Sequence, residues 1–186
     1  HDQMKKLITF TPNKNLELIN INKILDHIEG KPYDDDFDII NILEKGLDMM
    51  KEKLTSSNTK FDNISYEQIF YSSIKYYELT QTPHFPYSLD FTRIFSLNVN
   101  SFLFSYTAFN LITSLFEEIN LTEKSLKELI FSSKIRITMP IEKDIVSRLF
   151  KFNDILDSII ENLNLKLLTD YIFELCSKIM EYFENG

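Results

Sequence analysis

Glycine is scarce in this sequence. The 186 residues include three glycines, at positions 30, 46 and 186. Phosphate-binding loops and nucleophile elbows need closely spaced glycines, because their backbone turns sharply or approaches a ligand closely. No segment supplies the patterns G-x-G-x-x-G, G-x-x-x-x-G-K-[ST] or G-x-S-x-G. The sequence therefore argues against a nucleotide-binding Rossmann or P-loop domain within this chain.

Residues that carry metal or redox chemistry are also few. Cys176 is the single cysteine, so no internal disulfide is expected, and a reducing, intracellular compartment (cytoplasmic or organellar) is favoured. His1, His27 and His84 lie far apart and have no Cys or Glu partner at metal-ligand spacing. We expect no catalytic residues, no metal site and no cofactor in this chain.

One acidic cluster resembles the start of a calcium loop. Asp34, Asp36 and Asp38 alternate as EF-hand ligands do. However, Ile39 stands where the loop needs its turn glycine, and Lys45 stands in place of the bidentate glutamate. We therefore interpret the cluster as a solvated loop that caps the next helix.

Long hydrophobic runs and net positive charge are both missing. No apolar run reaches the roughly 18–20 residues of a membrane span, so no membrane association is expected. The formal net charge is −8, and phosphate contacts need a local cationic surface. Any nucleic-acid role therefore requires a concentrated basic patch. Apolar residues make up 44% of the chain, which is enough for a packed core.

Apolar periodicity predicts an all-α bundle of about six helices. A capping box, Ser65-x-x-Gln68, marks the start of one helix, and Thr122 caps another. The stretch 88–97 is expected to be irregular or a short turn. The helix at 102–119 is apolar nearly all round, which predicts central burial. The expected helices cover about residues 37–54, 65–82, 102–119, 122–130, 140–159 and 165–183.

The first residues differ from the rest of the chain. Short apolar stretches at 7–10 and 16–19 predict a small N-terminal β-hairpin, and residues 21–28 are expected to form a short helix. We interpret residues 1–36 as an N-terminal extension or the remnant of a preceding domain. Residues 37–186 then form the helical domain.

Polar and aromatic residues gather in two segments that remain as candidates for binding. Aromatic rings stack on unpaired bases, and amide side chains hydrogen-bond base edges. The alternative interpretation is that Phe102 and Tyr106 belong to the core. The candidate residues are Lys75, Tyr76, Arg93, Asn98, Asn100, Phe102, Tyr106 and Asn110.

The order of motifs from these segments onward resembles the helical, DALR-type anticodon-binding domain of arginyl-tRNA synthetases. That family has A-x-K-Y-x-x-L, D-Y-x-F-x-W-D-R-x-L-S and G-N-[TS]-G-x-Y-L-x-Y-A-x-A-R. This chain has S-I-K-Y-Y-E-L at 73–79, P-Y-S-L-D-F-T-R-I-F-S at 86–96 and N-V-N-S-F-L-F-S-Y-T-A-F-N at 98–110. Collinear matches follow in L-F-K-F-N-D-I-L at 149–156 and L-L-T-D-Y-I-F-E-L-C at 167–176.

The resemblance implies a class Ia synthetase anticodon-binding fold and recognition of the anticodon stem-loop of an arginine-accepting tRNA. Phe102, Tyr106 and the asparagines would stack on and read bases. Lys75 and Arg93 would contact phosphates or pack. ATP-dependent attachment of arginine would belong to a catalytic domain that this chain does not contain, so ATP is expected only there.

Departures from the family pattern keep a second interpretation open. The paired glycines around the family's Asn are absent, Asn110 replaces an arginine, and Phe91-Thr92 replace Trp-Asp. The HIGH-type and KMSK-type loops of the catalytic domain do not occur in this chain. A synthetase-derived module that binds a protein or ribonucleoprotein partner is the alternative. A basic patch beside Tyr106 favours tRNA, whereas an exposed apolar face there favours the alternative.

Overall fold

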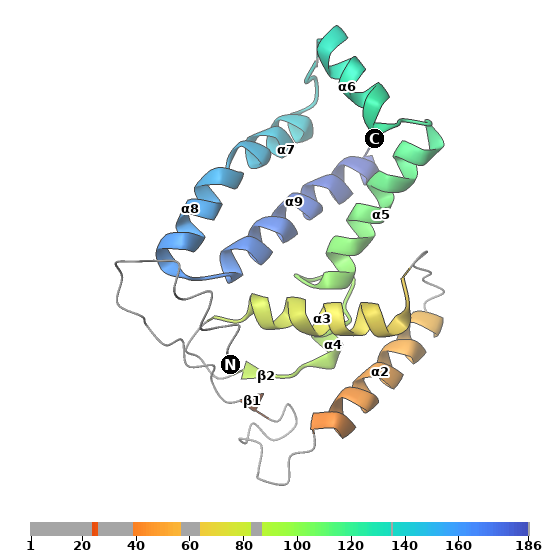
Figure 1. Cartoon of the computed structure of the whole chain (residues 1–186), viewed down its shortest axis with the longest axis vertical. Coiled ribbons are helices and arrows are strands. Elements are labelled where there is room, and N and C mark those ends of the chain that lie inside the picture. Colours follow the sequence, from red (N-terminus) through yellow and green to blue (C-terminus); the bar gives the residue numbers. More distant parts are fainter. Residues whose placement is uncertain (1–23, 26–38, 57–63, 83–86, 135, 186) are drawn as a thin grey trace.

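The computed structural model describes residues 24–25, 39–56, 64–82, 87–134 and 136–185, and it is helical apart from two very short strands (Figure 1). The strands, β1 and β2, pair in parallel, with Ile24 opposite Tyr87. The predicted all-α class is therefore confirmed. The elements are β1 (Ile24–Leu25), α2 (Ile39–Ser56), α3 (Tyr66–Thr80), β2 (Tyr87–Ser88), α4 (Phe91–Ile94), α5 (Phe102–Glu118), α6 (Glu123–Ser132), α7 (Pro140–Phe150), α8 (Phe152–Asn162) and α9 (Lys166–Asn185).

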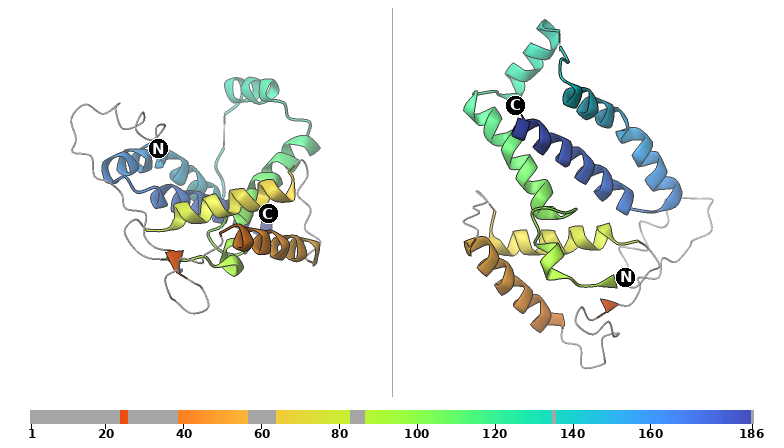
Figure 2. Two further views of the ribbon diagram at one scale, coloured as in Figure 1. Left: turned by 60° about the horizontal axis from the view of Figure 1, so that its bottom comes forward. Right: turned by 180° about the vertical axis from the view of Figure 1, so that it is seen from behind.

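Helix α3 lies at the centre of the arrangement. It contacts α2 and α4 as well as α5 and α9. Helices α7 and α8 pack along α9, and α5 packs against α9 as well (Figures 1 and 2). Helix α6 connects α5 to α7 and projects beyond the other helices (Figure 1). The result is two groups of helices that meet at α3.

The hydrophobic core lies at the α2–α3–α4 end. Phe70 is at its centre, with ring centroids 6.0 Å from Phe95 and 6.5 Å from Phe91. By contrast, α6, α7 and α8 contain no fully buried residue. Most of the apolar burial that stabilises the fold is therefore concentrated around α3. The buried cluster consists of Met50, Leu54, Ile69, Phe70, Tyr77, Ile94, Phe95 and Leu103.

Side-chain caps fix where several helices begin. The Ser65 hydroxyl accepts the Gln68 N–H at 3.2 Å, and the Gln68 side chain accepts the Ser65 N–H at 2.9 Å. Ser101 caps α5 by accepting the Phe104 N–H at 3.1 Å. The predicted caps at Ser65 and Thr122 are both confirmed. These bonds satisfy N–H groups that have no partner within the helix.

Polar contacts attach α7 to α9. Arg148 forms an ion pair with Glu174, and Lys178 lies 3.7 Å from Asp144. The Tyr171 hydroxyl donates to the Arg148 carbonyl at 3.2 Å. Helix α9 thus joins the α7–α8 segment to the rest of the molecule.

The prediction that the helix at 102–119 is centrally buried is wrong for most of its length. Leu103 and Ala108 are its only fully buried residues. Phe109 is 60% exposed and Ile119 is 57% exposed. The reason is geometric, because α5 extends beyond α3 and its neighbours cover only part of its circumference (Figure 1).

Two other sequence-based expectations need correction. The prediction of a helix at 21–28 is wrong for the two residues of this range that the structure describes. Ile24–Leu25 form strand β1, which pairs with the distant strand β2. The helix expected at 140–159 is divided at Lys151 into α7 and α8. The hairpin expected at 7–19 and the acidic cluster at 34–38 lie outside the described residues, and the division at residue 36 stays a prediction.

Gly46 permits α2 to approach the core closely. A Cβ atom at this position would lie 2.6 Å from two ring carbons of Phe91 and 3.0 Å from Phe70. We expect Gly46→Ala to lower the free energy of unfolding by about 1–3 kcal/mol through overpacking, although alanine favours a helix. Urea unfolding tests this. Lys45→Ala, at an exposed neighbouring position, is the control and should change little. A Gly46→Ala protein as stable as the parent would contradict the close packing.

Candidate nucleic-acid interface

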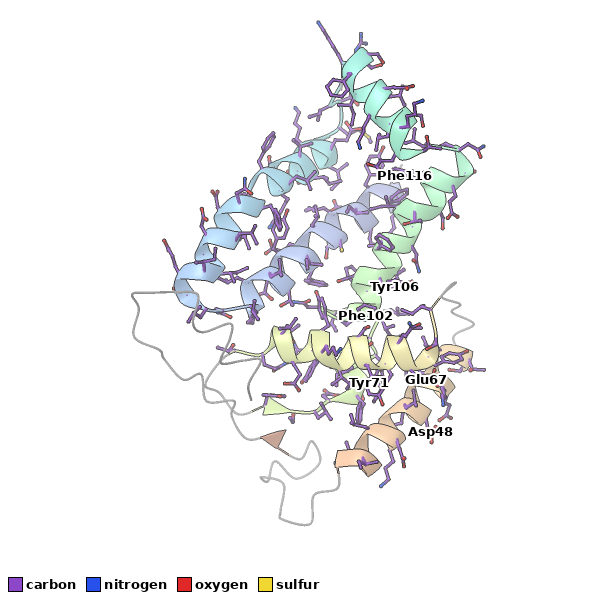
Figure 3. The ribbon with its side chains drawn as sticks, viewed as in Figure 1. Asp48, Glu67, Tyr71, Phe102, Tyr106 and Phe116 are labelled. Atoms are coloured by element: carbon purple, nitrogen blue, oxygen red, sulfur yellow. The ribbon has the colours of Figure 1, made fainter. Side chains whose placement is uncertain are left out.

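Three aromatic residues form a row along one face of α5. Phe102, Tyr106 and Phe109 are spaced by four and three positions, which places them on the same side of a helix. The Phe102 and Tyr106 rings are stacked, with centroids 5.4 Å apart and planes 16° apart. Tyr106 and Phe109 are also stacked, at 6.1 Å and 26°. We call these three residues the aromatic row; Figure 3 labels its first two members.

The aromatic row runs from the core to the surface. Phe102 packs against the hydrophobic core, Tyr106 is half-buried, and Phe109 is largely exposed. Phe102 therefore belongs in part to the core, as the alternative interpretation holds, and the base-stacking role of Phe102 and Tyr106 stays a prediction. The row is a column of neighbouring rings whose inner end packs against the core and whose outer end reaches solvent.

A hydrogen-bond network holds the turn that precedes the aromatic row. The Tyr76 hydroxyl donates to the Asn100 side-chain oxygen at 2.9 Å, and the Asn100 amide donates to Asp170 at 3.0 Å. Lys166 forms an ion pair with the same Asp170. We call Tyr76, Asn100, Asp170 and Lys166 the Tyr76 network. It joins α3, the turn before α5 and the first turns of α9.

Burial favours the protonated, uncharged forms of Tyr76 and Cys176. Removal from solvent raises the pKa of Tyr76 to about 12, so its hydroxyl remains a donor at neutral pH. Burial also raises the pKa of the Cys176 thiol, which lies close to Ser105. This environment suits an unreactive structural thiol rather than a nucleophile.

The remaining candidate residues are distributed around this arrangement. Lys75 on α3 and Arg93 on α4 are exposed. Asn98 is exposed in the turn before α5, and its N–H donates to the Ser96 hydroxyl at 3.2 Å. Asn110 is half-buried on α5. The binding roles of these residues stay predictions.

The sequence analysis did not nominate Asp170 or Phe109. Asp170 is separated from Asn100 by a long stretch of chain, so only the folded structure brings the two together. The sequence did contain a signal for Phe109, namely its spacing. It follows Tyr106 by three positions and therefore continues the same helical face.

The aromatic row lies in an uncharged part of the chain. Residues 94–116 contain no Asp, Glu, Lys or Arg. Any recognition by this face of α5 must therefore come from stacking and neutral hydrogen bonds. Nearby cations would have to come from other elements.

The described residues contain no group of three or more His, Cys, Asp or Glu side chains that could hold a metal ion. None of the helices in this described part is both long enough and apolar enough to cross a membrane.

Comparison with known proteins agrees with this fold. Residues 108–186 match the family model of the DALR anticodon binding domain. The arginine–tRNA ligase of Buchnera aphidicola subsp. Cinara cedri is 25% identical over 97% of this chain, and the cytoplasmic arginine–tRNA ligase of Homo sapiens is 26% identical over 77%. The aligned regions are 32% and 22% of those relatives, so this chain spans about a third of their length or less.

Two solved structures share the fold at low sequence identity. The arginyl-tRNA synthetase of Plasmodium falciparum superposes with a TM-score of 0.61 at 21% identity, over 81% of this chain and 27% of that one. The enzyme of Thermus thermophilus gives 0.64 at 13% identity, over 86% and 26%. Residues 108–186 are therefore similar to the DALR anticodon binding domain, and the chain is similar at low identity to one part of arginyl-tRNA synthetases.

The Tyr76 network generates a stability prediction. Tyr76→Phe removes the hydroxyl that bonds Asn100 and leaves that part-buried amide without this donor. We expect a loss of about 1–2 kcal/mol in the free energy of unfolding. Tyr71→Phe is the control, because it removes the hydroxyl of a half-exposed tyrosine on the same helix and keeps the ring beside Phe70. Equal stability of the two variants in urea would show that the network contributes nothing.

Proposed function

We propose that this divergent anticodon-binding domain binds the anticodon stem-loop of an arginine-accepting tRNA. The observation that carries the proposal is the aromatic row on α5, the helix at which the family match begins. The domain performs no bond-forming step itself. Its contribution is to orient the tRNA, which accelerates a reaction elsewhere by fixing the geometry of the substrate.

The chemistry of the aromatic row suits unpaired bases. Proteins recognise single-stranded RNA loops by splaying the bases, stacking them on aromatic rings and bonding their edges. Each stacked base contributes about 1–3 kcal/mol. The side-chain amides of Asn98 and Asn110 carry both donors and acceptors, which suits base edges.

Phosphate contacts are expected to be few. The chain is acidic, and the proposed cationic contacts are Lys75 and Arg93. Each phosphate neutralised on a single strand contributes a slope of about −0.7 to the dependence of log affinity on log salt. Two such contacts predict a slope of about −1.4, which is shallow for an RNA-binding protein. Stacking then supplies a large part of the affinity.

The relatives suggest the wider setting. They are named as arginine–tRNA ligases, and this chain corresponds to a fraction of their length. ATP and arginine would therefore be bound by a catalytic part outside the present sequence. We place the activity in a compartment where tRNA is aminoacylated, the cytoplasm or an organelle.

A second function is favoured by the surface of α6. Phe131 is 91% exposed, and Leu129 and Ile130 are each about half exposed. No residue of α6 is buried. Exposed neighbouring apolar side chains commonly mark protein interfaces. The domain would then act as an interaction module for a protein or ribonucleoprotein partner.

Titration with RNA tests the first function. We expect arginine-accepting tRNA to bind more tightly than an unrelated tRNA, with an affinity that falls modestly between two salt concentrations. Tyr106→Ala removes the middle ring of the aromatic row and should weaken binding by about 5- to 150-fold. Phe131→Ala is the matched control, since it removes an exposed ring on α6 and should leave the affinity unchanged.

The opposite pattern would support the interaction module. If the wild-type chain binds neither tRNA at low salt, RNA recognition by this chain is rejected. If α6 instead binds a protein or ribonucleoprotein partner, Phe131→Ser would weaken binding of the purified partner, whereas Tyr106→Ala would not.

A further inference from the structure

We infer that Phe109, the outer ring of the aromatic row, provides the face on which an unpaired nucleobase stacks, and that Tyr106 is a positioning residue beneath it. This inference rests on the proposed RNA-binding function. It assigns the base contact to Phe109, whereas the sequence pattern nominates Phe102 and Tyr106.

Tyr106 lies between two other rings. Each residue advances about 1.5 Å along a helix, so Phe102, Tyr106 and Phe109 follow one another along the axis of α5. Phe102 lies on one side of Tyr106 and Phe109 on the other, with both neighbouring planes within 26° of the Tyr106 plane. The two neighbouring phenylalanine rings therefore limit the access of a base to Tyr106.

Phe109 has the accessible face. Its side chain is 60% exposed, whereas Tyr106 is half-buried. A phenyl ring has no polar atom, so its recognition chemistry is limited to stacking and apolar contact. Because Phe109 is already stacked on Tyr106, little side-chain entropy remains to be lost when a base is added.

The surroundings of Phe109 suit a flat ligand. Anchoring side chains at protein interfaces usually fill pockets. One depression on the described surface is lined by α6 and another by the last turns of α5 with the α5–α6 turn, and Phe109 lines neither of these two. Residues 94–116 carry no charged side chain, so this part of α5 itself offers a ligand only stacking, apolar contacts and neutral hydrogen bonds. A nucleobase is flat, aromatic and uncharged, so it suits stacking on an exposed phenyl ring.

Stacking on Phe109 is expected to supply affinity rather than base identity. Every base has a π face, so stacking tolerates different sequences. Variants of Phe109 should therefore weaken binding of cognate and unrelated RNA loops by similar factors. Discrimination between tRNAs would depend on hydrogen-bonding groups elsewhere on the surface.

The absence of tryptophan from this sequence permits a direct spectroscopic test. Phe109→Trp introduces a single indole into the full chain. We expect a hairpin with the anticodon-loop sequence to quench its fluorescence on binding, because the base stacks on the indole. Phe131→Trp is the matched control, with a single exposed indole on α6 that should not be quenched.

A substitution series separates stacking from structural support. Phe109→Ala and Phe109→Leu should each raise the Kd for a labelled hairpin by about 5- to 150-fold, whereas Phe109→Tyr should restore binding. Leucine keeps an apolar side chain but lacks a flat ring, so a purely structural role would let it substitute. Urea unfolding should show similar stability for all three variants.

The outcomes distinguish this inference from the function on which it rests. Hairpin binding with no quenching of Phe109→Trp, or with wild-type affinity in Phe109→Leu, would overturn the assignment of Phe109 and leave RNA binding intact. A wild-type chain that binds no RNA would overturn both. Quenching of both tryptophan variants would also overturn the assignment, since it would show no preference for α5.

Discussion

The hydroxyl of Tyr76 joins the two groups of helices. It donates to Asn100 in the turn that starts α5, and Asn100 in turn donates to Asp170 near the start of α9. The buried core lies on the α2–α3–α4 side of this point, and α7 and α8 have no fully buried residue of their own. The position of the outer helices therefore depends on how α9 and α5 are held against α3.

This constraint determines what α5 can present to a partner. One face of α5 packs on α9, where Phe104 and Phe173 have ring centroids 5.1 Å apart. Another face carries the aromatic row, which the fixed turn at Asn100 anchors at its inner end. Helix α5 extends past α3 (Figure 1), and Phe109, the outer ring of the row, is 60% exposed. The proposed binding surface is thus a consequence of incomplete coverage of an apolar helix.

The acidity of the chain shapes the proposed recognition. A net charge of −8 and an uncharged segment at 94–116 are unfavourable for binding through many phosphates. Stacking and neutral hydrogen bonds do not depend on phosphate contacts, so this electrostatic penalty does not apply to them. The exposed side chains of α6 lie on a different element and would serve a different partner. Tertiary structure therefore separates the two proposed functions onto α5 and α6.

The sequence by itself determined the helical class, the starts of helices at Ser65 and Thr122, and the order of motifs that resembles a synthetase domain. These features are local, because periodicity and caps act within a few residues. Only the tertiary structure decided that Phe109 is exposed and that the Asn100 amide contacts Asp170. Burial depends on which faces the neighbouring helices cover, and a pair such as Asn100 and Asp170 forms only when distant segments meet. Local sequence patterns carry neither kind of information.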